Sequence, residues 1–283
     1  MTIYVLPFEK MHGLGNDFVL VEKRHLPQAV DENALARLLC DRHFSIGADG
    51  LIIVDLSSTR DADFEWHYYN SDGSEAEMCG NGMRCFAKYV FERGITDETT
   101  FLVKTKAGII RPIIEEDGSV TVNMGEPKLP EKLKEELVID SKSFIYTYIE
   151  TGNPHCVIFV DEEVDNDAFY NLGPTIEKHD KFPNGTNVEF AKILNKKEIK
   201  VRVWERGCGA TLACGTGACA VVVAANINNL CDRLVNVYLP GGCLKINWDK
   251  DSNNLFLNGP VTFTYSGQFN LDPGLICRQA SFT

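Results

Sequence analysis

The chain has 283 residues, and its 28 basic and 40 acidic side chains give a formal net charge of −12 at pH 7. An acidic chain without a concentrated stripe of Lys and Arg is poorly suited to nucleic acid or to an anionic membrane, and we expect neither as a partner. Residues 1–20 lack a basic segment followed by an unbroken apolar one, and no apolar run reaches the length of a membrane span. We therefore expect a cytoplasmic protein, long enough for two domains.

The first half of the chain predicts strands, an outer helix and an inner helix. Gly15-Asn16 leads into a strand-like run rich in Val and Leu, and residues 32–42 form an amphipathic stretch that predicts a helix outside the first sheet. Residues 64–70 alternate as a strand does, and the apolar residues 85–91 predict a buried helix. Further strands are expected at 100–104, 109–115 and 119–124.

The second half repeats this order after an exposed, charged link at 126–136. Gly152-Asn153 again leads into a strand-like run, 201–205 alternates, and 218–225 is apolar on all sides, which predicts an interior helix. Strands are then expected at 235–239, 244–248 and 255–257.

Equivalent landmarks in the two halves lie at nearly one separation. The two Gly-Asn pairs are 137 residues apart, and the element Cys-Gly-x-Gly, which begins at Cys79 and again at Cys214, recurs after 135 residues. Ordered repeats with so little drift indicate two copies of one unit. The predicted fold is α+β, with two pseudo-symmetric repeats, each a curved mixed or antiparallel sheet wrapped around a central helix.

The two repeated cysteines are the candidate reactive groups. Each would sit at the first turn of a helix, where unsatisfied backbone N–H groups and the helix dipole favour a thiolate. Two such helix ends related by an approximate two-fold axis would face each other, so we expect Cys79 and Cys214 to flank one ligand.

The remaining cysteines indicate neither a disulfide framework nor a metal site. The ten cysteines of a chain without a secretion signal are expected to stay reduced, and none has the Cys-x-x-Cys spacing typical of structural zinc. Cys85 and Cys219 fall inside the two apolar helices and are expected to be buried core residues. We predict no metal and no cofactor.

Two opposed thiols suit the inversion of a carbon that bears hydrogen. One thiolate can remove the proton while the other thiol donates to the opposite face. An α-amino acid is the natural candidate substrate, because donors aimed at its carboxylate would stabilise the charge that develops there. The backbone N–H groups beginning at Gly80 and Gly215 are suited to that role.

Several segments together resemble the diaminopimelate epimerases, and the resemblance covers nearly the whole chain. They are Met-His-Gly-Leu-Gly-Asn-Asp-Phe at 11–18, Ile-Gly-Ala-Asp-Gly at 46–50, Asn-Ser-Asp-Gly-Ser at 70–74, Met-Cys-Gly-Asn-Gly at 78–82, Gly-Asn-Pro-His at 152–155, and Glu-Arg-Gly at 205–207 with Ala-Cys-Gly-Thr-Gly at 213–217. The resemblance implies an isomerase that interconverts LL- and meso-diaminopimelate without pyridoxal phosphate, in lysine and peptidoglycan precursor biosynthesis. Ala210 and Gly50 depart from forms frequent in that family.

The resemblance also implies roles for individual residues. Cys79 and Cys214 would be the base and acid pair, and Arg206 would hold the distal carboxylate as a bidentate fork. The reacting carboxylate would be bound by Gly80, Asn81, Gly215 and Thr216. The polar cage would be completed by Asn16, Asn70, Asn153 and Asn187. Near the reacting ammonium and the thiols would lie Glu205 and, as a supporting residue, His155.

We expect an N-terminal domain at 1–127 and a C-terminal domain at 128–283, and the family fold suggests that the tail 268–283 packs back on the first domain. The expected partner is the small-molecule substrate, and a homodimer is compatible with the sequence.

Four other functions compete with this one. Proline and hydroxyproline racemases share the paired cysteines but typically lack Glu-Arg-Gly and tend to carry His where Asn81 stands, while isomerases of the phenazine type generally lack the cysteine pair. A redox sensor could use Cys79 and Cys214 as a switchable disulfide. A nucleotide site is disfavoured, since the glycine motifs lack the third Gly of a dinucleotide fingerprint and the Lys of a phosphate loop.

Overall fold

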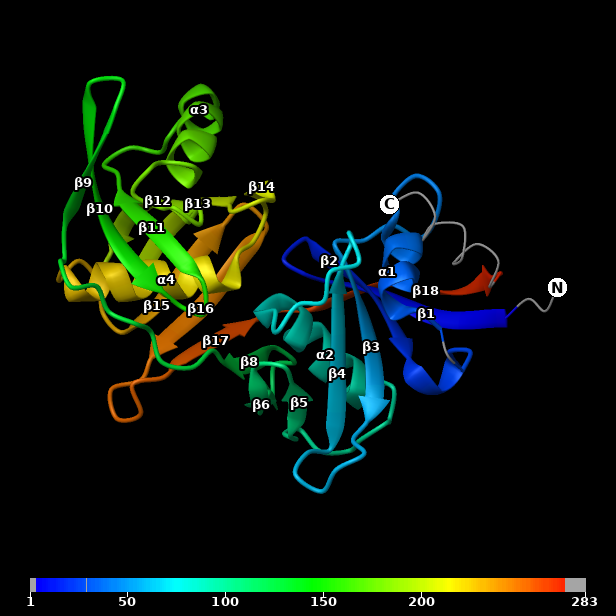
Figure 1. Cartoon of the computed structure of the whole chain (residues 1–283). Coiled ribbons are helices and arrows are strands. Elements are labelled where there is room, and N and C mark those ends of the chain that lie inside the picture. The colour runs from blue at the N-terminus through cyan, green and yellow to red at the C-terminus, as the bar shows by residue number, and fades with distance from the viewer. Residues whose placement is uncertain (1–3, 29, 273–283) are drawn as a thin grey trace. The chain divides into compact units, whose positions relative to one another are not determined.

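The structure, a computed structural model, describes residues 4–28 and 30–272 (Figure 1). The chain divides into two compact units. Unit 1 comprises the described residues of Met1–Val122 and Pro260–Thr283, and unit 2 is Asn123–Gly259.

Unit 1 is built on a seven-stranded mixed sheet with the order β18-β1-β2-β3-β4-β5-β6. Its pairs are antiparallel except β2 with β3 and β4 with β5, which are parallel. The strands are β1 (Tyr4–Gly13), β2 (Asn16–Glu22), β3 (Gly50–Leu56), β4 (Phe64–Asn70), β5 (Val103–Thr105), β6 (Gly108–Ile110) and β18 (Thr262–Leu271). The hairpin of β7 (Ile113–Ile114) and β8 (Val120–Asn123) follows β6.

Two α-helices and a short 3-10 helix, η1 (Lys23–His25), complete unit 1. The helix α1 (Glu32–Cys40) begins where Asp31 accepts a hydrogen bond from the Ala34 N–H, and it buries one face against the sheet. The helix α2 (Gly80–Glu92) packs on β1, β2 and β3. Central strands covered on both faces explain the unbroken apolar runs in β2 and β3.

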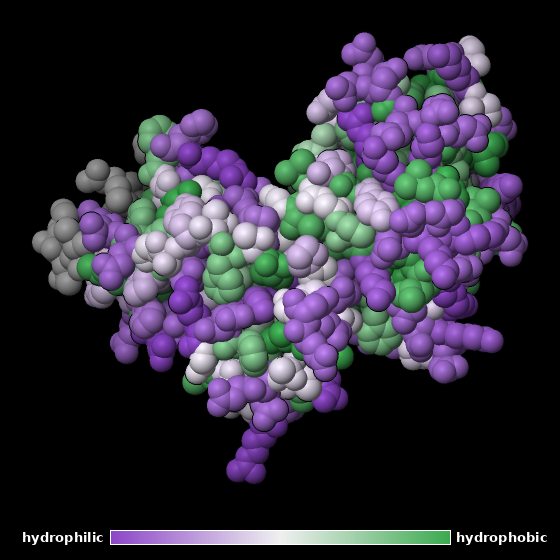
Figure 2. Space-filling view, turned by 180° about the vertical axis from the view of Figure 1, so that it is seen from behind, coloured by the Kyte–Doolittle hydropathy of each residue, from purple (hydrophilic) through white to green (hydrophobic). Residues whose placement is uncertain are grey.

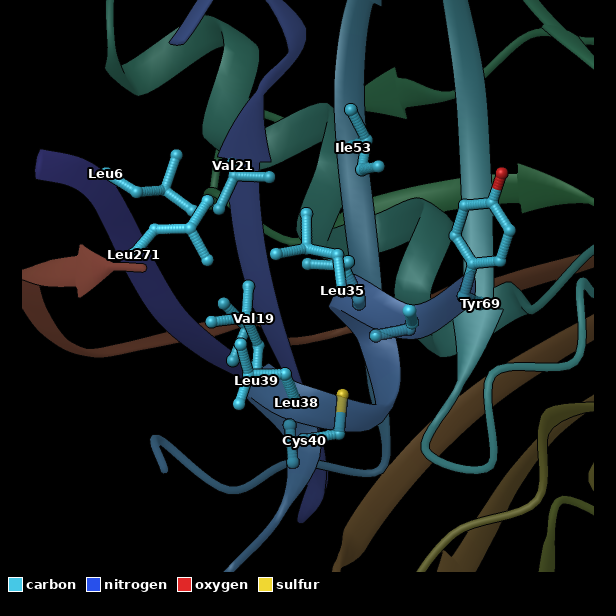
Figure 3. Packing of buried hydrophobic residues seen from close by; sticks show 14 residues of the cluster. Leu6, Val19, Val21, Leu35, Leu38, Leu39, Cys40, Ile53, Tyr69 and Leu271 are labelled. Carbon is cyan, nitrogen blue, oxygen red and sulfur yellow. The ribbon is translucent and has the colours of Figure 1, made fainter. Parts of the chain in front are cut away.

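The core between α1 and the sheet is shown in Figure 3, where Leu35 and Leu39 point toward Val19 and Val21 of β2. Leu271, from the last described strand, lies in the same cluster. This cluster therefore joins residues from both ends of the chain.

Unit 2 repeats the design with the strand order β17-β16-β15-β13-β12-β11-β10-β9, and the short β14 (Gly209–Thr211) pairs with β13. The strands β11 and β12 are parallel, as are β13 and β15. Their bounds are β9 (Glu135–Ile139), β10 (Lys142–Glu150), β11 (Pro154–Phe159), β12 (Asn187–Asn195), β13 (Glu198–Glu205), β15 (Leu234–Leu239), β16 (Gly242–Trp248) and β17 (Leu255–Gly259).

The helix α4 (Gly215–Ile227) is buried on all sides among the strands of unit 2, as its uniformly apolar sequence predicts. The helix α3 (Asn166–Glu177) covers part of the sheet from outside. A side chain at Gly173 of α3 would lie 2.7 Å from the Trp204 ring, so this glycine allows the helix to approach β13 closely.

The predicted fold class is confirmed, since each unit is a mixed sheet with a central helix and the two units share one topology. The order β1-β2-α1-β3-β4-α2-β5-β6 in unit 1 corresponds to β10-β11-α3-β12-β13-α4-β15-β16 in unit 2, apart from the small β14. On the face shown in Figure 2, hydrophilic side chains cover much of each unit and small hydrophobic patches lie between them.

The division of the chain differs from the expected one at 127/128. Residues from Pro260 onward belong to unit 1, because β18 pairs along β1 from Tyr4↔Leu271 to His12↔Thr262. Residues 273–283 of the expected tail lie outside the described residues. The segment expected as an interdomain link at 126–136 belongs to unit 2, where Lys128 bridges to Glu150.

Candidate active site

In unit 1, Cys79 is the N-cap of α2. Its backbone is extended, and its sulfur accepts a hydrogen bond of 3.4 Å from the Gly82 N–H. A side chain at Gly82 would lie 2.9 Å from the Trp66 ring, so the glycine lets the first turn of the helix pack directly on the sheet. The half-buried thiol thus sits at the positive end of a buried helix, as the sequence predicts.

Asn16 connects Cys79 with Asn81. Its Oδ1 accepts from the Cys79 thiol at 3.7 Å and from the Asn81 Nδ2 at 3.1 Å, while its own Nδ2 donates to Asp49 at 2.9 Å. A carboxylate can only accept, so Asp49 fixes the Asn16 amide with its oxygen toward the thiol.

Asp49 is held in turn by a charged cluster. Arg42 donates to Asp49 at 2.7 Å and to both oxygens of Asp17, which also pairs with the buried Lys10 at 2.7 Å. Burial raises the pKa of Asp17, but the hydrogen bonds and charges of Arg42 and Lys10 outweigh it and hold that pKa well below its usual value. Asp17 is therefore ionised throughout the neutral range.

Two further predicted residues of unit 1, Asn70 and Gly80, lie at the end of β4 and at the start of α2. Asn70 ends β4, and its Nδ2 donates to Ser74 at 3.0 Å. Gly80 begins α2, and its carbonyl accepts from the fully buried Arg84 at 3.3 Å. Gly50, one of the two departures from the family pattern, lies where a Cβ would be 2.5 Å from the Tyr68 ring.

In unit 2, Cys214 is the N-cap of α4 and is buried. Its sulfur accepts from the Gly217 N–H at 3.4 Å and lies 3.4 Å from the Thr216 hydroxyl. The Thr216 carbonyl accepts from Thr151 at 3.0 Å, and Gly215 begins the helix. This arrangement repeats that of Cys79 at the equivalent helix.

The environment of Cys214 disfavours its thiolate. Burial raises the pKa of this thiol well above its usual value, and the charges of Glu205 and Glu189 add to the effect against the hydrogen bonds from Thr216 and Gly217. Burial also raises the pKa of Glu205, although hydrogen bonds from Thr211, at 2.5 Å, and from the Cys214 thiol oppose that rise. Cys214 is therefore a protonated thiol at neutral pH.

His155 lies fully buried on β11 between two oxygen atoms. Its Nδ1 is 2.6 Å from Glu189 Oε1, and its Nε2 is 2.8 Å from Asn153 Oδ1. Glu189 is also fully buried, on the neighbouring strand β12. The two expected residues His155 and Asn153 are thus in contact. The carboxylate of Glu189, which the motifs did not indicate, contacts the other nitrogen of the ring.

Asn187, the first residue of β12, holds the turn that follows β13 and begins at Arg206. The Arg206 N–H donates to Asn187 Oδ1 at 2.9 Å, and Asn187 Nδ2 donates to the Pro154 carbonyl at 2.9 Å. The Arg206 guanidinium donates to the Asn184 carbonyl at 3.1 Å. Glu177 of α3 fixes the turn by accepting from the Gly207 N–H at 2.9 Å. Asn187 therefore orders both the Arg206 turn and the strand end that bears His155.

The motifs assigned no role to Asp49, although it lies in the segment 46–50, and they did not include Glu189 or Glu177. The available signal for Glu189 was a charged residue in the otherwise apolar strand around Val188 and Phe190, where a buried carboxylate requires a partner. Within the described part of the chain, no group of three His, Cys, Asp or Glu side chains is arranged to hold a metal ion. No described helix is long and apolar enough to cross a membrane.

Solved structures share this fold. A hydroxyproline epimerase from Agrobacterium vitis superposes with a TM-score of 0.72 at 14% identity, covering 95% of this chain and 93% of that one. A phenazine biosynthesis protein of the PhzF family from Bacillus anthracis superposes with a TM-score of 0.68 at 16% identity, covering 96% of this chain and 100% of that one. The chain thus has the two-repeat fold found in racemases, epimerases and PhzF proteins.

Comparison of the sequence identifies one family among the proteins that share this fold. The family model described as diaminopimelate epimerase matches residues 8–130 and 147–264. Diaminopimelate epimerases from Desulforapulum autotrophicum and Natranaerobius thermophilus are each 46% identical to this chain. Each alignment covers 94% of this chain, together with 99% of the first relative and 98% of the second. The chain belongs to the diaminopimelate epimerase family.

Proposed function

We propose that the protein is a diaminopimelate epimerase, which interconverts LL- and meso-2,6-diaminopimelate by transferring protons between two cysteines and the α-carbon. The observation that carries the proposal is the placement of Cys79 and Cys214 as N-caps of the equivalent buried helices in two repeats. Membership of the diaminopimelate epimerase family supports the choice of substrate.

In the proposed reaction, each thiol serves one face of the α-carbon. Cys214 enters as the protonated acid, since burial and two carboxylates hold its proton. Cys79 then provides the thiolate for the isomer that presents its α-proton to that side, and the roles exchange in the reverse direction. Backbone N–H groups at Gly80 and Gly215, with Asn81 and Thr216, would bind the reacting carboxylate.

The distal end of the substrate requires its own recognition. Arg206 would pair with the distal carboxylate, for which a guanidinium offers two parallel donors. The surrounding polar cage would comprise Asn16, Asn70, Asn153 and Asn187, with Glu205 near the reacting ammonium and His155 in support. By the same proposal, the enzyme acts in lysine and peptidoglycan precursor biosynthesis in the cytoplasm.

The test is ¹H NMR of the reduced protein in D₂O with LL-diaminopimelate, L-proline and L-lysine in separate tubes. We expect loss of the α-proton signal and formation of the meso isomer only with diaminopimelate, because lysine lacks the distal carboxylate and proline is a cyclic imino acid. Exchange only with proline would assign the protein to the proline racemases. No exchange in any tube would favour a redox or binding role for the two thiols.

A further inference from the structure

Glu189 occupies a position that the proposed reaction leaves unexplained. It is fully buried on β12, whose parallel pairing with β11 sets Val157 opposite Glu189 and His155 opposite Asn187. Its Oε1 contacts His155 Nδ1 at 2.6 Å, and its Oε2 has no hydrogen-bond partner among the described residues. An ionised carboxylate buried in this way requires a positive partner.

The carboxylate also lies beside the first turn of α4. A Cβ placed on Gly217 would be 2.8 Å from Glu189 Oε1 and 3.3 Å from Cys214 Sγ. The absence of a side chain at Gly217 is therefore what lets the carboxylate approach the helix end that carries Cys214. Other titratable groups share this environment. Glu205, at the end of β13, interacts with both Glu189 and His155, and the thiols of Cys214 and Cys156 interact with Glu189.

His155 is held through both of its ring nitrogens. Its Nδ1 contacts the Glu189 carboxylate, and its Nε2 contacts the carbonyl oxygen of Asn153. Glu189 and Asn153 therefore fix the position of the imidazole between them.

The contact with His155 also sets the orientation of the Asn153 amide. With Oδ1 engaged by His155, the Asn153 NH₂ group is turned away from the ring and donates to no described residue. The NH₂ end of the amide is therefore the end available to a ligand.

We propose that Glu189 is a positioning residue, which holds His155 against Asn153 so that Asn153 presents its NH₂ group to a carboxylate of the substrate. The proposal rests on the proposed epimerase function for the identity of that carboxylate. The two contacts that run from Glu189 through His155 to Asn153, called the relay below, involve only residues of unit 2. They can be observed in the free protein.

The test is Glu189→Gln, which keeps the size of the side chain and removes its charge. We expect KM for LL-diaminopimelate to rise about 10- to 100-fold with a smaller change in kcat, since a hydrogen bond to a charged group is lost. The ¹⁵N shifts of His155 should also change, because the partner of its Nδ1 becomes an amide instead of a carboxylate. Glu163→Gln, on the surface of the same unit, is the matched control and should match the wild type in KM and spectrum.

Two results would overturn the relay. One is a Glu189→Gln protein whose KM or His155 spectrum equals that of the wild type. The other is a loss confined to kcat, which would place the effect of Glu189 at Cys214. If Glu189→Gln does not fold, Glu189→Asp provides the same comparison, because its shorter side chain withdraws the carboxylate from His155. Absence of turnover in the wild type would count against the epimerase, whereas the spectrum reports on the relay independently.

Discussion

At the scale of single residues, the two half-sites differ although their cysteines occupy equivalent positions. Cys79 is half-buried and contacts the neutral amide of Asn16, whereas Cys214 is buried beside Glu205 and Glu189. The helix dipole favours a thiolate at both, but at Cys214 burial and negative charge outweigh it. This asymmetry gives a base and an acid from one repeated motif.

The first prediction concerns the two thiols. Cys79→Ser and Cys214→Ser keep an acceptor at the helix N-cap, so folding should be retained, yet serine is a far weaker acid and base. We expect epimerisation to fall by at least about 100-fold in each serine variant and to vanish in each alanine variant. Cys243→Ala, on β16, is the control. Full activity in either alanine variant would refute the two-thiol mechanism.

The second prediction concerns the charged cluster behind Asn16. Because the pKa of Asp17 is lower in the folded protein, its stabilisation is complete above the ordinary pKa of about 3.9 and is lost as the pH falls below it. Asp17→Asn leaves Lys10 buried without its partner and should lower the free energy of unfolding by roughly 3 kcal/mol at pH 7.

Urea denaturation between pH 7 and pH 3 measures this effect. The difference between the wild type and Asp17→Asn should shrink as the pH approaches 3, while Glu162→Gln, which breaks an exposed ion pair, should cost less than about 1 kcal/mol. A difference that stays constant with pH would show that ionised Asp17 does not stabilise the fold.

At the scale of elements, the repeat could be predicted because its signals are local. The Gly-Asn turns, the strand at 64–70 and the two apolar helices follow from periodicity and glycine placement, and the observed β4 has the predicted bounds. The helix α3 was missed because its amphipathic pattern is interrupted by Gly173 and Pro174. Glu189, which lies near Cys214, comes from β12, and Asp49, which holds Asn16 beside Cys79, immediately precedes β3. Only the arrangement of the strands brings these residues near the thiols.

The third prediction concerns the first turn of α4. Replacing a helical glycine with alanine usually stabilises a helix by about 1 kcal/mol, but at Gly217 the new methyl group would meet Glu189 and Cys214. Gly217→Ala should therefore lower both the melting temperature and the epimerase activity. The rate of epimerisation and a thermal melt provide the measurement, and a stabilised, active variant would show that this close approach is not required.

At the scale of the whole molecule, the last described strand completes the first sheet. The pairing of β18 with β1 joins residues at least 250 positions apart, and Leu6 and Leu271 are both fully buried there. Local sequence patterns carry no information about so distant a partner, which is why the boundary was expected at 127/128. Only the family resemblance suggested that the tail returns to the first domain, and it did so from residue 268 and not from residue 260. Unit 1 can therefore be completed only after the strand at 262–271 has been synthesised.

The fourth prediction tests this closure. Leu271→Ala removes a fully buried side chain and should lower the free energy of unfolding by about 2 to 5 kcal/mol. Val5→Ala, on β1 but half exposed, should change it far less. Chemical denaturation compares the two variants, and equal small effects would mean that the strand contributes little to unit 1.

The most direct measurement is the deuterium content of the meso-diaminopimelate that forms from LL-diaminopimelate in D₂O, determined by mass spectrometry during the first few turnovers. Transfer between two thiols predicts a product that carries one deuteron at the inverted carbon, while the unreacted LL isomer keeps its proton. A product that retains the original proton would contradict the account, since a single base would then remove the proton and return it.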